Sequence, residues 1–439
     1  MKSFRISIDN LLTDENVRQA FLKPANGKRN RADVAKVLAE LEKHISIVQD
    51  MIRNGEFVPP RHPDVLINEK GYQKQRTIRK PDYKYEQVVH HVVVSGIKDG
   101  IEHGMYAYVL GSVPGRGAHL GKKRINRWIR EDPANTKYVF KMDIRHFFQS
   151  VDHDILKRWL AKKFRDKYML DLMYLIIDAN DMGLALGFYT SQWFANFLLQ
   201  PLDHYIKEVL GVKYMTRYMD DIVSFGANKR HLHRVKDAVE RYLAEELNLT
   251  MKGNWQVFRF EYEQEDVCIQ CHTLKDLRIL DATMDKAKIR HHVICEKRKT
   301  IIVMSKREYE RKQSKADLLI KQYGGCKREK IRIYGRPLDY MGFEFHRHKT
   351  IMRESIMIRA TRRARKIGKS AAVCWKTAAS FLSCLGWLNN TNTYDMYLQR
   401  IKPFVNIKAM KKVVSKHQRR INKNESGMGN SGGLQTGAA

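Results

Sequence analysis

The sequence predicts an α+β protein in which helical segments are interspersed with short strands. Residues 31–52 place their apolar side chains at helical spacing. Residues 138–151 form an apolar and aromatic run typical of a buried strand, and residues 214–226 indicate two strands joined by a turn. With 439 residues, 43% of them hydrophobic, the chain is long enough for two or three subdomains around a sizeable core.

The remaining elements follow in order from periodicity and turn residues. A hairpin is expected from residue 64, turning at residues 69–71, and helix resumes after Pro81. Four later segments have helical periodicity: 154–165, 168–178, 189–210 and 229–247. Residues 338–347 resemble a strand, whereas the charged residues 261–331 predict no definite structure. The Gly/Ser-rich residues 425–439 are typical of a disordered tail.

The charge of the chain favours a polyanionic partner. Lys and Arg total 81 against 48 Asp and Glu, a formal net charge of +33. Residues 353–369 hold seven basic side chains and one acid, and residues 402–420 hold seven more and none. Phosphate binding with counterion release would offset this repulsion, so nucleic acid is the leading partner, with a merely basic protein as the alternative.

The location expected from the sequence is the cytoplasm, with no membrane association. No run of 18 apolar residues is present, and the N-terminus lacks the apolar core of a secretory signal. Six cysteines in 439 residues do not suggest a disulfide framework.

Three aspartates form the candidate catalytic centre. Asp220 and Asp221 are adjacent within an apolar run, and they can share a site only at a hairpin tip because strand neighbours face opposite ways. Asp143 lies within another apolar strand, residues 139–148, and could meet Asp220 at one sheet edge if the two strands pair. Clustered carboxylates repel, and Mg²⁺ would remove that cost. The alternative for an isolated Asp-Asp pair is a turn or a helix cap.

Four motifs in order resemble the palm of reverse transcriptases: VFKMDIRHFF, LGFYTSQ, YMDD and LDYMGFEF. The resemblance implies a right-hand polymerase that copies an RNA template into cDNA from deoxynucleoside triphosphates by extending a primer. It also implies that Asp143, Asp220 and Asp221 hold two Mg²⁺ ions.

The resemblance assigns further residues, each with a plainer alternative. Phe148 would be the aromatic gate against a 2′-hydroxyl, although alone it would be an ordinary core residue. Arg76, followed by Arg79 or Lys80, would bind the triphosphate, although the strand could simply be solvated. Lys252 would protonate the pyrophosphate leaving group. The expected template–primer contacts are Tyr218, Met341 and Gly342.

The resemblance also divides the chain into polymerase subdomains. Residues 1–138 would form the fingers and an N-terminal helical region, and residues 139–260 the palm. The palm would continue through residues 332–352 after an insertion at 261–331. Residues 353–420 would be a basic helical thumb, and residues 421–439 a disordered tail.

The motif around Leu186 indicates the subtype. Leu186, Gly187 and Gln192 give a form similar to reverse transcriptases of diversity-generating retroelements, which miscopy template adenines and work with a structured RNA and a small basic accessory protein. Replacing a polar amide with Leu186 would loosen discrimination at the nascent base pair. Alternatives are neutral drift in a defence-associated or retron-like reverse transcriptase, and a non-catalytic RNA-binding protein.

The insertion also suggests a structural zinc site. Its C-x2-C and H-x3-C spacings could place four ligands around one ion. The predicted ligands are Cys268, Cys271, His291 and Cys295.

Overall fold

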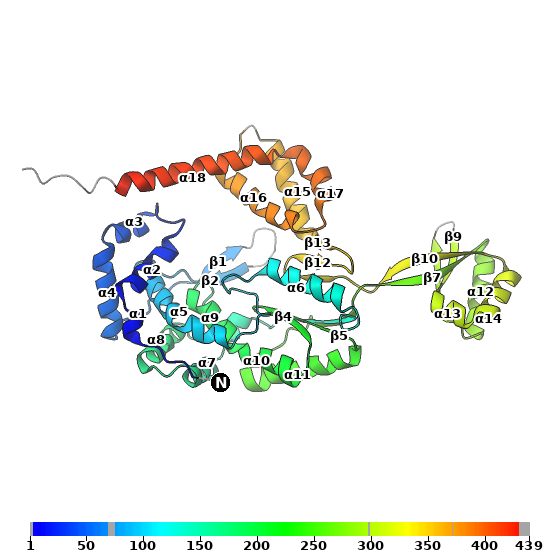
Figure 1. The fold of residues 1–439 in the computed structure, drawn as a ribbon, viewed down its shortest axis with the longest axis horizontal. Coiled ribbons are helices and arrows are strands. Elements are labelled where there is room, and N and C mark those ends of the chain that lie inside the picture. The colour runs from blue at the N-terminus through cyan, green and yellow to red at the C-terminus, as the bar shows by residue number, and fades with distance from the viewer. Residues whose placement is uncertain (1–2, 69–74, 297–298, 371, 430–439) are drawn as a thin grey trace, which may run out of the picture. The chain divides into compact units, whose positions relative to one another are not determined.

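The computed structural model describes residues 3–68, 75–296, 299–370 and 372–429, so the predicted turn at 69–71 lies outside the described residues. The chain divides into two compact units (Figure 1). The first comprises Met1–Val257, Asp339–Phe345 and Lys349–Ala439, and the second comprises Phe258–Leu338 and His346–His348. The mixture of helices with antiparallel sheets confirms the predicted α+β class.

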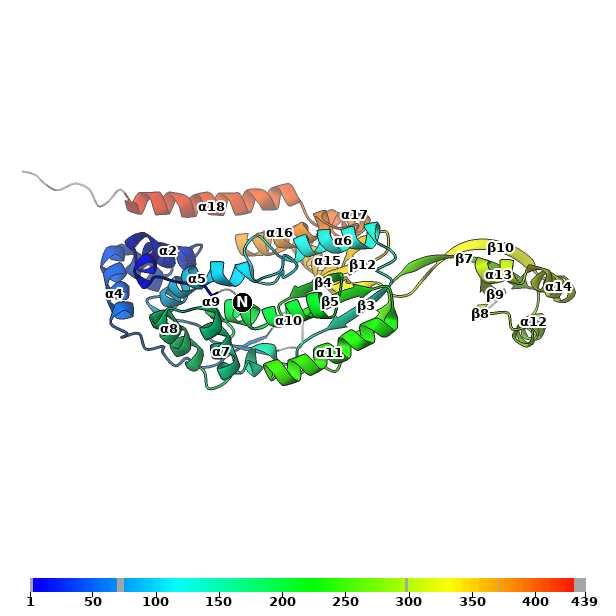
Figure 2. The ribbon, with the colours of Figure 1, turned by 60° about the horizontal axis from the view of Figure 1, so that its bottom comes forward.

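The first unit holds most of a four-stranded sheet in the order β4-β5-β3-β6, of which β3, β4 and β5 are labelled in Figure 2. Its strands are β3 (Tyr138–Met142), β4 (Tyr214–Tyr218), β5 (Asp221–Gly226) and β6 (Gln256–Arg259). β5 pairs antiparallel with both β3 and β4. Met142 of β3 lies opposite Ile222 of β5, and Tyr218 of β4 lies opposite Asp221 of β5. Four consecutive residues of β5 are buried, as expected for a central strand covered on both faces.

The helix α11 (Lys229–Leu247) packs against β3 and β5. It begins where the Asn228 side chain accepts hydrogen bonds from two backbone amides of the first turn. It ends at Asn248, whose φ of 51° is left-handed. The side chains that face the sheet recur every three or four residues: Leu232, Val235, Val239, Leu243 and Leu247.

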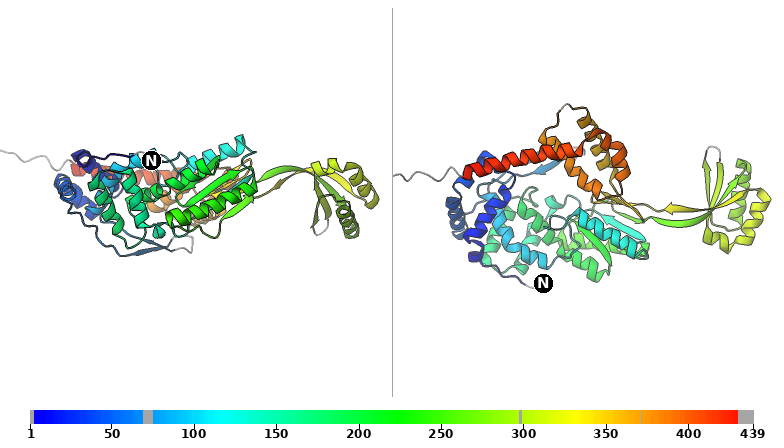
Figure 3. Two further views of the ribbon diagram at one scale, coloured as in Figure 1. Left: turned by 90° about the horizontal axis from the view of Figure 1, so that it is seen from below. Right: turned by 45° about the horizontal axis from the view of Figure 1, so that its top comes forward.

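The N-terminal region is helical, as predicted, and its helices are blue to cyan in Figure 3; the longest of the first five is α5 (Glu86–His103). α5 packs against α2 and α9. Its buried residues lie on all of its faces, because other elements cover the helix on several sides. The first four helices are α1 (Ile8–Leu11), α2 (Asp14–Ala25), α3 (Ala32–Ala39) and α4 (Leu41–Arg53). The predicted hairpin consists of β1 (Val65–Asn68) and β2 (Gln75–Ile78).

The helices between β2 and β4 complete this core. They are α6 (Ala118–Glu131), α7 (His153–Lys163), α8 (Lys167–Asp178), α9 (Tyr189–Leu198) and α10 (Gln200–His204). The single helix predicted over 189–210 is divided instead, because α9 ends at Leu198, Pro201 lies in the first turn of α10 and a π-helical turn follows over Tyr205–Val209.

The C-terminal part of the first unit is helical and basic, as predicted. It follows a small sheet of β11 (Leu338–Tyr340), β12 (Phe343–Phe345) and β13 (Thr350–Met352). The helices are α15 (Glu354–Gly368), α16 (Trp375–Asn389), α17 (Tyr394–Arg400) and α18 (Ile407–Gly429). The tail predicted to be disordered from 421 is helical as far as Gly429, and residues 430–439 are outside the described part.

The second unit has definite structure where the sequence predicted none. Its sheet runs β10-β7-β9-β8 and is formed by β7 (Tyr262–Cys271), β8 (His292–Glu296), β9 (Lys299–Ser305) and β10 (Cys326–Tyr334). The helices are α12 (Leu274–Lys286), α13 (Lys306–Arg311) and α14 (Gln313–Tyr323). A capping box of Thr273 and Asp276 starts α12, and buried aliphatic residues of α12, β7 and β9 form a separate core.

Across the described ranges, the structure has no helix with the length and apolar character needed to cross a bilayer.

Candidate active site

The YMDD segment forms the tip of a two-residue hairpin, as predicted. Tyr218 at the end of β4 is opposite Asp221 at the start of β5, so Met219 and Asp220 alone make the turn. Met219 has a φ of 57°, a left-handed conformation that costs a non-glycine residue on the order of 1 kcal/mol. The surrounding structure must therefore hold this turn in place.

A buried ion pair beneath the hairpin supplies that support, and the sequence analysis missed it. Arg217 is fully buried in β4 and forms two-pronged contacts with Asp203, the shortest from Nη2 to Oδ2 at 2.6 Å. Its Nη1 also donates to Asn196 Oδ1 at 3.0 Å and to the Met219 carbonyl at 3.1 Å. The guanidinium thus fixes the turn residue that precedes Asp220. An arginine within an apolar strand was the signal that could have revealed it.

Asp143 meets Asp220 at this sheet edge, as predicted. Asp143 directly follows β3, whose last residue is paired with Ile222 of the hairpin. The Asp143 and Asp220 carboxyl groups lie within hydrogen-bonding reach of each other. Burial, with the Asp143 charge as the next cause, raises the pKa of Asp220 to about 6, while the Arg76 charge opposes that rise.

Asp221 occupies a more enclosed position than its neighbour. Its Oδ1 is buried and has no hydrogen-bond partner among the described residues. Burial is the main cause that raises the pKa of Asp221 to about 7, with added repulsion from the other two aspartates and opposing charges from Lys141 and Arg353. An orphaned carboxylate oxygen beside two further carboxyl groups is a donor set that suits a hard divalent cation such as Mg²⁺.

Three of the predicted nucleotide-binding residues line one cavity of about 480 Å³, large enough for a nucleotide. Arg76 on β2, Phe148 and Leu186 line it together with Asp143 and Asp220. Phe148 is half-buried beside the fully buried Phe147, with ring centroids 5.5 Å apart. The aromatic ring, the basic side chain and the carboxyl groups therefore share one space.

Lys252 also lines this cavity, beside Asp143. Its Nζ is 3.5 Å from Asp143 Oδ2, and its backbone N–H donates to the Asp143 carbonyl at 2.9 Å. The side chain is partly exposed, which leaves it able to reach a ligand in the cavity.

Three predicted nucleotide-binding residues do not line the cavity: Lys80, Gly187 and Gln192. Lys80 and Gln192 are exposed. Gly187, at a φ of 117°, is required for close packing, because a Cβ there would lie 2.1 Å from the Arg79 carbonyl oxygen. The Arg79 N–H donates to the Leu186 carbonyl at 2.8 Å, so Gly187 permits the contact that positions Leu186.

Arg79, the other predicted triphosphate ligand, is held elsewhere. Its Nε contacts Asp64 Oδ1 at 2.9 Å, and its Nη1 contacts the Asn180 side chain. Asp64, Arg79 and Asn180 line a neighbouring cavity that also reaches Leu186. The guanidinium therefore joins the β1–β2 hairpin to the end of α8.

The predicted primer-contacting residues are tied to the aspartate hairpin. Met341 and Gly342 make the turn between β11 and β12, with φ values of 50° and 81°. The Tyr340 hydroxyl, just before them, donates to the Asp221 carbonyl at 3.1 Å. Tyr218 is 38% exposed beside the tip, where its ring is available to a ligand.

The predicted zinc site is wrong. Cys268 and Cys271 lie three residues apart on the extended strand β7, so their side chains point to opposite faces of the sheet. Cys271 is buried in the core, and Cys295 is exposed. His291 instead contacts Asp281 at 2.7 Å, and with Asp285 these make up a candidate metal-binding group that contains no cysteine.

Neutralising Asp221 is expected to stabilise the metal-free protein. The Asp221→Asn variant removes a buried, unpaired carboxylate, and its free energy of unfolding should rise by about 1–3 kcal/mol. Thermal unfolding in EDTA and in Mg²⁺ measures this. Mg²⁺ should raise the Tm of the wild type more than that of the variant. A variant less stable than the wild type in EDTA would contradict the expectation.

Comparison with known proteins identifies the domain that holds these residues. Residues 70–256 match the family model described as reverse transcriptase (RNA-dependent DNA polymerase). A search of curated proteins found no match. Similar solved structures include a truncated apo telomerase from Candida tropicalis, at 13% identity and a TM-score of 0.37, over 48% of this chain and 55% of that one.

Telomerase from Candida albicans in complex with a fragment of telomeric RNA is also similar, at 11% identity and a TM-score of 0.35. This match covers 46% of this chain and 42% of that one. The chain spans about half the length of the telomerase structures it matches. The segment that matches the reverse transcriptase family model, residues 70–256, includes Asp143, Asp220, Asp221 and the residues that line the cavity beside them.

Proposed function

We propose that the protein is an RNA-directed DNA polymerase that extends a primer on an RNA template. The observation that supports this most strongly is the contact between the Asp143 and Asp220 carboxyl groups in a nucleotide-sized cavity. The domain match over residues 70–256 indicates the same class of reaction. The partners follow from it: RNA template, cDNA with its primer, and deoxynucleoside triphosphates.

The chemistry is nucleotidyl transfer, with each side chain in a defined role. Bound divalent cations would activate the primer 3′-hydroxyl and stabilise the leaving oxygen. Asp143 and Asp220 would hold them, with Asp221 completing the set. Arg76 would neutralise the triphosphate, and Lys252, 3.5 Å from Asp143, would give a proton to the departing pyrophosphate.

The subdomain roles belong to the same proposal. The sheet of β3 to β6 with its aspartates would be the palm, and the helices before it the fingers. α15 would be part of a thumb, because Arg362, Arg363 and Arg365 are exposed opposite its buried face. Basic side chains on such a surface grip the duplex backbone without reading sequence.

Primer extension on an RNA template tests the proposed function. We expect the purified protein with Mg²⁺ to add deoxynucleotides in the order that the template specifies. An oligonucleotide without a template should not be extended. Absence of templated incorporation, or incorporation in an order unrelated to the template, would contradict the proposal.

Removing the Phe148 ring is expected to admit ribonucleotides. The Phe148→Ala variant opens the part of the cavity that a 2′-hydroxyl would occupy, so discrimination against ribonucleotides should fall by about 10²-fold. Single-nucleotide extension with matched deoxy- and ribonucleotides measures this ratio. Phe148→Tyr keeps the ring and is the control. Unchanged discrimination in Phe148→Ala would contradict the gate role.

We also propose that the enzyme is error-prone and serves a diversity-generating retroelement, with a small basic accessory protein. Leu186 lines the same cavity as Asp220 and presents an apolar side chain where an amide would form hydrogen bonds. A defence-associated or retron-like enzyme is the alternative. Adenine-directed errors in sequenced products distinguish the two.

The Leu186→Gln variant is expected to copy template adenines more accurately. Restoring an amide in the cavity should reduce misincorporation opposite adenine by about tenfold. Sequencing of cDNA from a fixed template measures the error rate for each template base. Gln192→Ala is the matched control, because Gln192 belongs to the same motif but does not line the cavity. Equal error rates in the wild type and Leu186→Gln would contradict this role for Leu186.

A further inference from the structure

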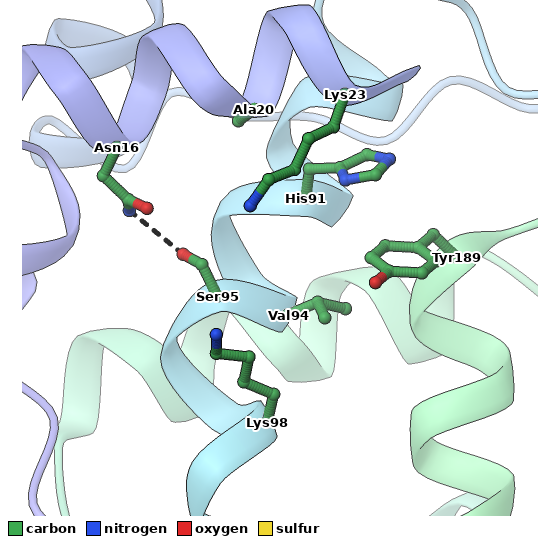
Figure 4. A pocket seen from close by; sticks show the side chains of 8 residues that line it. All are labelled: Asn16, Ala20, Lys23, His91, Val94, Ser95, Lys98 and Tyr189. Atoms are coloured by element: carbon green, nitrogen blue, oxygen red, sulfur yellow. Dashed lines mark hydrogen bonds between the residues drawn. The ribbon is translucent and has the colours of Figure 1, made fainter. Parts of the chain in front are cut away.

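A second pocket lies among α2, α5 and α9, and it shares no lining residue with the nucleotide cavity (Figure 4). Lys23 of α2, His91 and Lys98 of α5, and Tyr189 of α9 line it. Apolar side chains of Ala20 and Val94 form part of its walls.

The floor of this pocket is fixed by hydrogen bonds that satisfy its neutral groups. Asn16 Nδ2 donates to Ser95 Oγ at 3.0 Å and to the Leu11 carbonyl at 2.6 Å. The Ser95 hydroxyl in turn donates to the Val92 carbonyl at 2.7 Å. Asn16 and Ser95 therefore join α2 to α5 and are already engaged.

The two lysine side chains of this pocket have almost no carboxylate partners. Within the described part of the chain, Lys23 has no carboxylate in ion-pair range, and Lys98 has only Asp99, at the limit of 4.0 Å. Figure 4 shows both lysine side chains extending along the pocket, with the Tyr189 ring at its other side. An ammonium group can only donate hydrogen bonds, so two of them in one pocket suit a ligand rich in acceptors.

His91 and Tyr189 form a platform beside the lysines. Their rings are stacked with centroids 4.3 Å apart and an interplanar angle of 20°. Burial lowers the pKa of His91 to about 4, with the His90 and Lys23 charges adding to the effect, so the imidazole is neutral near pH 7. A neutral imidazole and a phenol can each donate one hydrogen bond to an anion without adding charge.

We propose that this pocket binds a phosphate group through Lys23 and Lys98, with Tyr189 and His91 as neutral donors. Phosphate offers several acceptor oxygens, and its negative charge would neutralise the two lysines. Its source is the RNA backbone or a free phosphate compound, and only the RNA source depends on the proposed function. Tyr189 begins α9, three residues after Leu186, so the bound group would contact the helix that follows the nucleotide-binding segment.

Protection of the lysine amines from an acylating reagent tests the site directly. Mass spectrometry of the full chain would compare labelling of Lys23 and Lys98 with labelling of Lys36 and Lys229, which are exposed elsewhere. We expect labelling of the pocket lysines to fall about threefold or more with bound RNA. Protection by millimolar inorganic phosphate alone would identify a free phosphate as sufficient. Protection by neither ligand would overturn the proposal.

Variants separate this site from general electrostatic attraction. If RNA is the source, the Lys23→Ala/Lys98→Ala double variant should bind single-stranded RNA more weakly, with a slope of log K against log salt smaller by about 0.7. Lys23→Arg/Lys98→Arg should restore binding, and Lys36→Ala/Lys229→Ala, which removes the same charge, should leave the slope unchanged. Equal slopes in both alanine variants would exclude the RNA source.

The outcomes also separate this inference from the proposed function. Phosphate protection of Lys23 and Lys98 in a protein that extends no primer would leave the pocket standing and remove the polymerase. Normal primer extension without protection of Lys23 and Lys98 by RNA or phosphate would remove the phosphate pocket and leave the polymerase standing.

Discussion

Replacing Asp220 with asparagine is expected to lower the rate of nucleotide incorporation by about 10³-fold or more, because the carboxylate proposed to hold a cation at the reacting centre is lost. Asp220 lies against Asp143 in the cavity, so the amide keeps the shape of the side chain while removing its charge. Single-turnover extension of a primer on an RNA template measures the rate.

Asp171→Asn is the matched control for this variant. Asp171 is exposed on α8 and does not line the cavity, so the same change there should leave the rate unaltered. Template-dependent incorporation by Asp220→Asn at a rate near that of the wild type would contradict the assignment of Asp220.

Of the substitutions proposed, loss of Arg217 is expected to lower the free energy of unfolding the most. The Arg217→Met variant leaves Asp203 charged and fully enclosed, and removal of one partner from such a pair typically costs about 3–5 kcal/mol. Urea unfolding measures the change. Lys213→Ala, which breaks an exposed contact with Asp132, should have little effect by comparison. Equal stabilities of the two variants would contradict the structural importance of the buried pair.

A double variant distinguishes the structural from the positioning role of Arg217. Arg217→Met with Asp203→Leu removes both charges and should recover most of the stability. The Met219 carbonyl still lacks its donor, so nucleotide incorporation should remain reduced. Full recovery of both stability and activity would show that Arg217 does not position the hairpin.

The acidic centre was predictable because its signals are local in sequence. Two adjacent acids within an apolar run demanded a hairpin tip, and Tyr218 and Asp221 are paired with only Met219 and Asp220 between them. Asp143 could be added because it was predicted within a second apolar strand, and in the structure it directly follows β3, which pairs with the hairpin. Phe148 and Leu186 required the motif resemblance, since each alone is indistinguishable from a core residue.

The support of the hairpin was not predictable, because its parts come from separate elements. Arg217, Asp203 and Asn196 meet only when β4 packs on α9 and α10. The zinc prediction failed for a related reason. A C-x2-C pair suits an ion only on a turn, and β7 keeps Cys268 and Cys271 in extended conformation with their side chains on opposite faces.

The secondary structure of the inserted unit could not be predicted from charge and periodicity either. β10 is exposed along most of its length and rich in basic residues, so it has no alternating apolar pattern. It is defined by pairing with β7 over the full run from Cys326 opposite Gln270 to Tyr334 opposite Tyr262. Long-range pairing of this kind has no signature within the strand itself.

The central claim is that Asp143 and Asp220 together hold the divalent cation of an RNA-directed DNA polymerase. Replacing Mg²⁺ with Fe²⁺ and generating hydroxyl radicals at the bound ion tests it most directly, because the radicals cleave the chain next to the metal. We expect cleavage beside Asp143 and beside Asp220, abolished at both places by Asp143→Asn. Cleavage confined to the neighbourhood of Asp281 and His291, or unaffected by Asp143→Asn, would contradict it.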